Sequence, residues 1–421
     1  MFRLVLTACL ILFASTGKTM KAADPVRFTE LLIADKYGYT FGSAAADLDG
    51  DGDLDLTNVD IVGKSPSAAS LFWFRNDGSG NLQRHVIHDG EDGWLERHAI
   101  GDLSGDKLPD VAVVSNRDGL LLWFEHPGRD LTVKWKRRVI SNECKHAYDV
   151  VMADLDGDGD LDAATAGYVS HTAYWFENPG KASWERNWPR HVLADKLTEN
   201  RTMRVGDFNG DGKPDLLVAS VGASYAVVGP EGKPEGHGAV VAWLENAKDP
   251  KQPWPRHVID NASRGAIHGH PVDLDRDGDL DVVMAFGMRA EHIPEMQHQV
   301  VWYENLSSLG ESRKWQRHVI ADFPCAFEAI AVDLDGDGDL DVAATSWSKG
   351  DRVAWFENSG DPRREWKLHV LKEDFFAANQ IIAADLNGDG RPDLIATADD
   401  GSRRVQGANE FRWWRNDGRR Q

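Results

Sequence analysis

Short apolar runs alternate with acidic, glycine-rich turns along almost the whole chain. Runs such as Val282–Ala285 have the length of a strand and are bounded by turn residues. A nine-residue acidic segment that begins and ends with aspartate separates each pair of runs. It occurs seven times, at Asp47–Asp55, Asp102–Asp110, Asp154–Asp162, Asp207–Asp215, Asp273–Asp281, Asp333–Asp341 and Asp385–Asp393. The regular recurrence indicates an internal repeat rather than several unrelated domains.

Two further apolar runs follow each of the first six acidic segments. The first carries a tryptophan and occurs at Phe72–Phe74, Leu122–Phe124, Tyr174–Phe176, Ala242–Leu244, Val301–Tyr303 and Ala354–Phe356. The second occurs at Arg84–Ile87, Arg137–Ile140, Arg190–Leu193, Arg256–Ile259, Arg317–Ile320 and Leu368–Leu371. Four strands in roughly 55 residues are typical of one β-propeller blade. Because the tryptophan recurs at one strand position, we expect it to pack between neighbouring blades rather than to bind sugar.

The seventh repeat ends after Arg412–Trp414 and has no fourth run, whereas residues 27–35 at the other end of the chain form a run without a repeat of its own. Pairing these two segments would close the ring and remove its open sheet edges. The sequence therefore predicts an all-β fold: a seven-bladed β-propeller with four-stranded blades, closed by the N-terminal strand. Residues 24–421 would form this single domain.

Residues 1–23 have the pattern of a signal peptide, with a charged start and an apolar run from Leu4 to Ala14 that is too short to span a bilayer. Leu6–Cys9 also matches a lipoprotein box, but the apolar run continues past Cys9, which favours ordinary cleavage. No later stretch is apolar enough to predict a transmembrane segment. We therefore expect a secreted or otherwise extracytoplasmic protein.

Composition narrows the possible partners and chemistry. The formal net charge of −21 argues against nucleic acid as a partner. Cys144 and Cys325 are the only cysteines after residue 23, so we expect buried thiols rather than a disulfide framework. The sequence contains no nucleophile elbow, phosphate loop, dinucleotide fingerprint or CxxC pair, which disfavours the enzyme classes that depend on them.

The acidic segments have the oxygen-rich composition that calcium prefers. In the third segment, Asp154, Asp156 and Asp158 are expected to coordinate through their side chains, Asp160 through its backbone carbonyl and Asp162 through a closing carboxylate. The same positions in three other complete segments give Asp47, Asp49, Asp51, Asp53 and Asp55; Asp273, Asp275, Asp277, Asp279 and Asp281; and Asp333, Asp335, Asp337, Asp339 and Asp341. Flanking strands and the absence of a glutamate at position twelve exclude an EF-hand.

Three segments depart from the full acidic pattern. Asparagine replaces the second carboxylate in two of them, which give the predicted ligands Asp207, Asn209, Asp211, Lys213 and Asp215, and Asp385, Asn387, Asp389, Arg391 and Asp393. Lys213 and Arg391 stand at the position that offers a backbone carbonyl. In the remaining segment, Asp102–Asp110, Ser104 replaces a carboxylate and Lys107 replaces a glycine. We expect weak or absent calcium binding there and several structural calcium sites elsewhere.

These segments and their blade context resemble the FG-GAP or VCBS repeats of integrin alpha-chain propellers and of many secreted bacterial proteins. The resemblance covers nearly the whole chain after residue 23. It implies calcium and a propeller, while function in such proteins ranges from adhesion and lectin-like binding to carbohydrate lyase or dehydratase chemistry. The fold alone therefore leaves the function open.

The first strand of each blade is expected to line a central channel, with alternate residues facing it. Five residues before the leading aspartates stand Arg97, Asp149, His268 and Glu328, and three before stand Arg204 and His270. His268 and His270 could divide acid and base roles or hold one further divalent metal. The candidate catalytic set is His268, His270, Arg204, Glu328, Arg97, Asp149, Tyr148 and His146. A channel lined by polar residues without chemistry remains the alternative.

Two functional hypotheses follow for the face opposite the acidic segments. One is a carbohydrate-binding propeller that catalyses metal-assisted β-elimination or dehydration of an oxidised sugar, with a layout like that of propeller-type aldos-2-ulose dehydratases and polysaccharide lyases. The other is a non-catalytic module that binds an extracellular protein or glycan. Long insertions at residues 222–238 and 286–299 are expected on this face, where a rigid scaffold commonly carries its binding loops. The sequence does not determine an oligomeric state.

Overall fold

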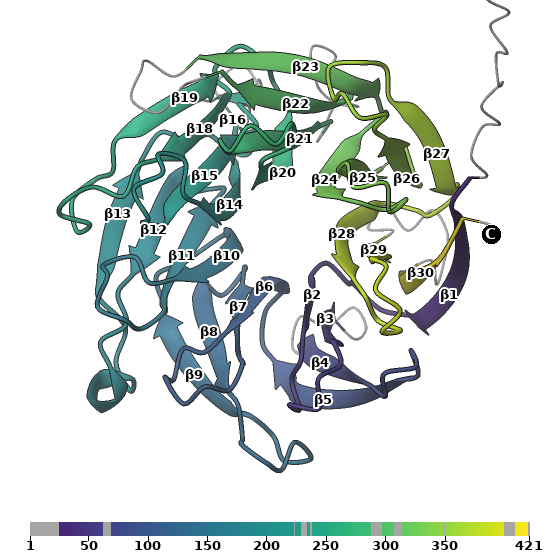
Figure 1. The fold of residues 1–421 in the computed structure, drawn as a ribbon. Coiled ribbons are helices and arrows are strands. Elements are labelled where there is room, and N and C mark those ends of the chain that lie inside the picture. The colour runs from purple at the N-terminus through teal and green to yellow at the C-terminus, as the bar shows by residue number, and fades with distance from the viewer. Residues whose placement is uncertain are drawn as a thin grey trace, which may run out of the picture.

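A computed structural model of the chain describes residues 25–61, 69–222, 224–228, 234–235, 238–287, 297–306, 314–348, 350–399 and 409–419. The predicted signal peptide and most of the two insertions lie outside the described residues. Seven four-stranded antiparallel sheets form a ring around a central axis (Figure 1). The predicted seven-bladed β-propeller is therefore confirmed.

Each blade begins at the axis and ends at the rim. Blade one contains β2 (Ser43–Ala46), β3 (Asp55–Ile61), β4 (Ala69–Asn76) and β5 (Leu82–Glu91), and blade two contains β6 (Leu95–Gly101), β7 (Asp110–Ser115), β8 (Leu120–Glu125) and β9 (Lys136–Ser141). Blade three contains β10 (Ala147–Ala153), β11 (Asp162–Gly167), β12 (Thr172–Phe176) and β13 (Arg190–Ala194). Blade four contains β14 (Asn200–Gly206), β15 (Asp215–Ser220), β18 (Val240–Leu244) and β19 (Arg256–Asp260).

The remaining blades follow the same order. Blade five contains β20 (Ala266–Val272), β21 (Asp281–Phe286), β22 (Gln299–Asn305) and β23 (Trp315–Asp322), and blade six contains β24 (Ala326–Val332), β25 (Asp341–Ser346), β26 (Arg352–Glu357) and β27 (Lys367–Lys372). Blade seven contains β28 (Ala378–Ala384), β29 (Asp393–Ala398), β30 (Glu410–Gly418) and β1 (Arg27–Asp35). A two-stranded ribbon, β16 (Ser224–Val228) with β17 (Pro234–Glu235), and a short 3-10 helix, η1 (Lys181–Ser183), complete the described elements.

The two chain ends close the ring as predicted. Strand β1 pairs antiparallel with β30, with Thr29 opposite Arg415 and Asp35 opposite Glu410. The last blade therefore combines β28, β29 and β30 with an edge strand, β1, that is the first strand in the described residues (Figure 1). Blade seven cannot complete its sheet until the rest of the chain has been made.

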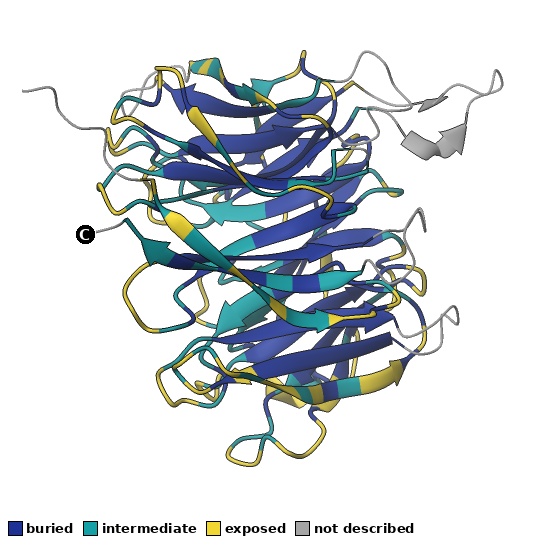
Figure 2. Ribbon diagram, turned by 90° about the vertical axis from the view of Figure 1, so that its right-hand side faces the viewer, coloured by how far each residue is buried: buried dark blue, intermediate teal, exposed yellow. Residues whose placement is uncertain are grey.

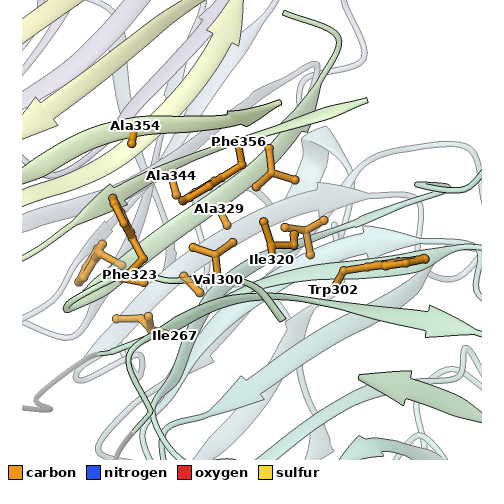
Figure 3. Packing of buried hydrophobic residues seen from close by; sticks show 14 of the residues in the cluster. Ile267, Val300, Trp302, Ile320, Phe323, Ala329, Ala344, Ala354 and Phe356 are labelled. Atoms are coloured by element: carbon orange, nitrogen blue, oxygen red, sulfur yellow. The ribbon is translucent and has the colours of Figure 1, made fainter. Parts of the chain in front are cut away.

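The core lies between the blades. The second strands are buried along their whole length, because each is covered by a neighbouring blade on both faces, whereas the fourth strands carry exposed positions (Figure 2). The seven recurring tryptophans are nearly or fully buried: Trp73, Trp123, Trp175, Trp243, Trp302, Trp355 and Trp413. Between blades five and six, Trp302 and Val300 join a cluster with Ala329, Ala344 and Phe356 (Figure 3). The tryptophans thus pack between blades, as predicted.

A β-bulge interrupts the first strand in six of the blades. The register shifts between Ala147 and Asp149 in β10, between Ala326 and Glu328 in β24, and at the corresponding place in β6, β14, β20 and β28. A bulge places two residues opposite one and breaks the simple alternation of sides. Consequently, residues five and six positions before the leading aspartate can both lie near the central axis.

Candidate functional site

The acidic loops join the first and second strands of every blade, so they all lie on one face of the ring. In the first loop, Asp47 Oδ1 accepts a hydrogen bond from the Gly50 amide at 2.8 Å, and its Oδ2 accepts one from Gly52 at 3.0 Å. Asp49 Oδ1 accepts from the Asp51 amide at 3.2 Å. These bonds fold the loop tightly and bring its carboxylates toward one another.

Two loop positions adopt left-handed backbone conformations, with φ of 76° at Gly50 and 97° at Gly52. Glycine has no Cβ and adopts such angles without strain. Lys107 takes the second of these positions in the Asp102–Asp110 loop with φ of 71°, and Arg276 takes the first in the Asp273–Asp281 loop with φ of 62°. The loop shape therefore survives in the segment where calcium binding is predicted to be weak.

Four loops bring three carboxylates together. One oxygen from each member lies within 4.8 Å of the others in the clusters Asp47, Asp49, Asp55; Asp154, Asp156, Asp162; Asp273, Asp275, Asp281; and Asp333, Asp335, Asp341. These are the four loops with the full acidic pattern. The other predicted ligands of these loops lie outside the three-carboxylate clusters: Asp51, Asp53, Asp158, Asp160, Asp277, Asp279, Asp337 and Asp339.

The closing aspartate of each loop is also a structural anchor. Asp55 is buried, and its two oxygens accept hydrogen bonds from the Leu48 and Asn76 amides at 3.0 and 2.7 Å. Burial, together with the neighbouring carboxylates, raises the pKa of Asp55 to about 6, that of Asp162 to about 7 and that of Asp341 to about 8. A cation close to these carboxylates would favour their ionised form.

The donor set of the loops fits a hard cation. It consists of carboxylate, amide and carbonyl oxygens, which are the ligands that calcium takes. Asp160 Oδ1, Asp273 Oδ1 and Asn387 Oδ1 are buried acceptors without a hydrogen-bond partner among the described residues. A calcium ion held by such oxygens would neutralise the repulsion within each loop and fix the turn between the two strands.

Basic side chains already approach three of the four clusters. Arg75 donates to Asp49 at 2.6 Å, Arg363 pairs with Asp275, and Arg419 pairs with Asp335. The equivalent Asp156 has no ion pair with any described residue. A cation entering the third loop therefore meets no competing guanidinium at this position.

In five blades, the residue three positions after the recurring tryptophan ties the loops of adjacent blades together. Asn76 Nδ2 donates to Leu54 O in its own blade at 3.0 Å and to Leu386 O in blade seven at 2.7 Å. Asn178, Asn246 and Asn416 make the corresponding bonds in other blades, and His126 replaces the asparagine in blade two with a bond to Leu48 O at 2.9 Å. The sequence analysis did not assign this role, although the recurrence of Glu-Asn at the end of the tryptophan strand signals it.

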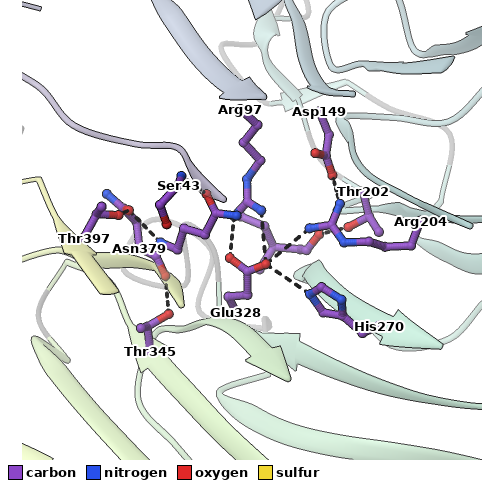
Figure 4. Close-up of polar contacts among 12 residues, drawn as sticks. Ser43, Arg97, Asp149, Thr202, Arg204, His270, Glu328, Thr345, Asn379 and Thr397 are labelled. Atoms are coloured by element: carbon purple, nitrogen blue, oxygen red, sulfur yellow. Dashed lines mark hydrogen bonds and ion pairs between the residues drawn. The ribbon is translucent and has the colours of Figure 1, made fainter. Parts of the chain in front are cut away.

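Five of the eight channel candidates form an ionic network across the ring (Figure 4). Glu328 of blade six accepts two hydrogen bonds from Arg97 of blade two, at 3.1 and 2.6 Å. Arg204 of blade four donates to Glu328 at 3.2 Å and also pairs with Asp149 of blade three. His270 Nε2 lies 3.2 Å from Glu328 Oε1. Side chains from five blades are thus joined at the axis.

The central ion pair of this network is buried, so each of its charges needs a partner. Arg97 and Glu328 are each 1% exposed. Burial on its own raises the pKa of a carboxyl, but the Arg97 guanidinium and His270 hold the pKa of Glu328 well below its ordinary value. Because the Glu328 carboxylate bonds three neighbouring side chains, it has a clear structural use that requires no substrate.

The other candidates lie beside this network. His268 is fully buried, stacks on the Tyr148 ring with centroids 5.5 Å apart, and has a pKa that burial lowers well below its ordinary value. His146 lies farther along the axis, where its Nδ1 is 3.3 Å from Asn116 Oδ1 and from the Tyr168 hydroxyl. Of the eight candidates, five therefore belong to the ionic network, His268 and Tyr148 stack on each other, and His146 contacts Tyr168.

A second set of residues lies beside the network, at the strand ends of blades one to four that point away from the acidic loops. We call Tyr39, Trp94, Glu96, Tyr168 and Arg201 the mouth cluster. Tyr39 donates to Glu96 at 3.0 Å, and its ring lies 4.7 Å from that of Trp94. Arg201 lies over the Tyr168 ring at 4.4 Å. Sequence reasoning missed all five. Alternation assigned the channel to positions other than Glu96 and Arg201, and the three aromatic residues lie outside the first strands.

The mouth cluster combines buried charge with accessible aromatic surface. Glu96 and Arg201 are each 5% exposed, whereas Tyr39, Trp94 and Tyr168 are partly exposed. Burial raises the pKa of Glu96 to about 7, despite the opposing effects of the Tyr39 hydroxyl and Arg201. A carboxyl group in this environment can donate or accept a proton near neutral pH.

The comparisons with known proteins identify the repeat. The family model described as FG-GAP-like repeat matches residues 102–165, 154–218 and 333–396. This protein is an FG-GAP repeat propeller. FG-GAP repeats are typical of extracellular proteins, and such propellers commonly mediate ligand or protein interactions. No curated protein sequence matches the chain.

One solved structure shares the fold of this FG-GAP propeller. BBS1N, in a crystal structure with ARL6DN soaked with lead, matches with a TM-score of 0.52 and 11% identity over 93% of this chain and 96% of that chain. This likeness concerns the fold alone. A luciferin-regenerating enzyme matches with a TM-score of 0.44 and 11% identity over 74% of this chain and 89% of that chain. Within the described ranges, no helix is long and apolar enough to cross a membrane.

Proposed function

We propose that this FG-GAP propeller is an exported, calcium-stabilised protein that binds carbohydrate at the mouth cluster. The observation that carries the proposal is a set of partly exposed aromatic rings, Tyr39, Trp94 and Tyr168, beside the buried polar side chains of Glu96 and Arg201. Aromatic faces pack against the apolar faces of sugar rings, and charged groups bond the hydroxyls. A rigid ring of blades holds these groups in place without the ligand.

The same geometry favours binding over lyase chemistry at the ionic network. Arg97 and Glu328 are buried and bonded to each other, and Arg204 is shared between Glu328 and Asp149. A substrate would have to break these ion pairs before it could use the groups as acid, base or electrophile. We therefore assign the network to holding the ring together and place ligand binding at the mouth cluster.

Calcium has a supporting role in this proposal. Ions in the acidic loops would stabilise the connection between the first two strands of their blades, on the face opposite the mouth cluster. Export would place the protein where free calcium is abundant. Fusing residues 1–23 to a reporter enzyme tests export, because a reporter that stays in the cytoplasm would contradict this part of the proposal.

Binding is tested with a matched pair of tyrosine variants. Tyr168 and Tyr174 are both partly buried, and an arginine lies over each ring, at 4.4 and 5.1 Å respectively. Tyr174 belongs to β12, outside the mouth cluster. On a glycan array, Tyr168→Ala should lose the carbohydrate signal of the wild-type protein, whereas Tyr174→Ala should retain it. Equal loss in both variants, or a wild-type protein that binds no glycan, would refute carbohydrate binding at this site.

A further inference from the structure

Two buried hydrogen-bond donors at the mouth cluster have no acceptor among the described residues. The Tyr148 hydroxyl is buried and unpaired in a side chain that is 3% exposed, and Arg201 Nε is likewise unpaired in a residue that is 5% exposed. The two groups are neighbours, because the Arg201 guanidinium lies 4.5 Å from the centre of the Tyr148 ring. Arginine carries only donors, so it cannot accept the Tyr148 hydroxyl proton.

Arg201 forms an ion pair with the buried Glu199 carboxylate, but this pair leaves Arg201 Nε without a hydrogen bond. The closest approach of Glu199 to Arg201 Nε is 3.8 Å, which is too long for a hydrogen bond. Glu96 is engaged by the Tyr39 hydroxyl. Buried donors without acceptors are costly, and these two lie against each other, so a single acceptor group could satisfy both.

The guanidinium is also held in a fixed orientation. The Tyr148 and Tyr168 rings contact it at 4.5 and 4.4 Å. A stacked guanidinium keeps its planar donors aligned, which favours a planar, charged acceptor such as a carboxylate over a single hydroxyl. His268 stacks on Tyr148, and Phe41 contacts the same ring edge-on, so the hydroxyl is equally constrained.

We propose that the mouth cluster binds an acidic sugar, a uronate, whose carboxylate accepts hydrogen bonds from Arg201 Nε and the Tyr148 hydroxyl. Tyr168 and Trp94 would flank the sugar ring, and Glu96 would bond a sugar hydroxyl. This inference rests on the proposed carbohydrate binding and adds the chemical class of the ligand. It also gives Tyr148 a ligand-binding role, with no part in acid or base chemistry.

The experiment compares uronate oligosaccharides with the same oligosaccharides after reduction of their carboxyl groups, by isothermal titration calorimetry. The wild-type protein should bind the acidic form at least about tenfold more tightly, because a charge-assisted bond is lost on reduction. Tyr148→Phe removes only the hydroxyl and should abolish most of this preference. Tyr37→Phe is the matched control, since Tyr37 is also buried with an unpaired hydroxyl but packs in the cluster between blades seven and one.

The calorimetry results distinguish failure of the uronate inference from failure of carbohydrate binding. Equal affinity for acidic and reduced sugars would overturn the uronate inference and leave carbohydrate binding intact. No binding of either sugar would overturn both, and binding of an acidic peptide instead would assign the donors to a protein partner. An undiminished preference in Tyr148→Phe would overturn the assignment of the site. The comparison of the two sugars needs no variant, so it remains decisive even if Tyr148→Phe were to unfold.

Discussion

The ionic network at the axis predicts a large loss of stability when Glu328 loses its charge. Glu328→Gln keeps the size of the side chain but leaves the buried Arg97 guanidinium without its carboxylate, at sites where the present distances are 3.1 and 2.6 Å. Removing one partner of a buried ion pair typically costs about 3 to 5 kcal/mol, because the remaining charge stays desolvated. Arg204 and His270 lose the same partner, so we expect a value in this range rather than below it.

Urea unfolding followed by tryptophan fluorescence measures this loss, and the 16 tryptophans provide the signal. Glu245→Gln is the matched control, because Glu245 pairs with His257 at 2.6 Å while both side chains are 37% exposed. An exposed pair contributes at most about 1 kcal/mol. Replacing Arg97 and Glu328 together by methionine should recover part of the loss, since no unpaired charge remains at Arg97.

A small effect would refute this reasoning. If Glu328→Gln lowered the free energy of unfolding by no more than Glu245→Gln, the network could not be holding the five blades together. A folded Glu328→Gln variant that lost a carbohydrate-consuming activity at unchanged stability would instead restore the catalytic interpretation of these residues. The two measurements together separate a structural role from a chemical one.

Three further predictions concern calcium and pH. Excess chelator should lower the thermal unfolding midpoint, because each occupied site stabilises the fold by about 2.7 kcal/mol at free calcium 100 times its dissociation constant, and an unchanged midpoint would contradict structural calcium. In calorimetry, Asp156→Asn should remove more of the calcium-induced rise in the unfolding midpoint than Asp106→Asn. Asp156 belongs to a three-carboxylate cluster without a competing arginine, whereas the Asp106 loop has no such cluster among the described residues. Equal losses in the two variants would oppose this ranking. Burial raises the pKa of Glu96 from 4.5 to about 7. The stability of the wild-type protein should therefore fall relative to that of Glu96→Gln as the pH rises from 4.5 to 7, by roughly 3 kcal/mol in urea unfolding. Parallel pH profiles of the two proteins would exclude this shift.

Repetition allowed most of the fold to be predicted from the sequence. Seven acidic segments in register established the number of blades, and the orphan run at residues 27–35 indicated how the ring closes. The aspartate clusters could also be predicted from the sequence, because all three members of each cluster lie within nine residues of one another. Local geometry is sufficient in these cases, since tight turns bring neighbouring residues together whatever the rest of the chain does.

The central site depended on the tertiary structure. The sequence placed Arg97 and Glu328 at equivalent positions but could not show that they meet, because they are 231 residues apart and come from blades two and six. It also missed Glu96 and Arg201, because the bulges that alter the alternation of the first strands arise from how those strands pair. Contacts within a repeat follow from its local sequence. Contacts across the axis exist only once seven sheets have closed into a ring, where buried charges must be paired to be stable.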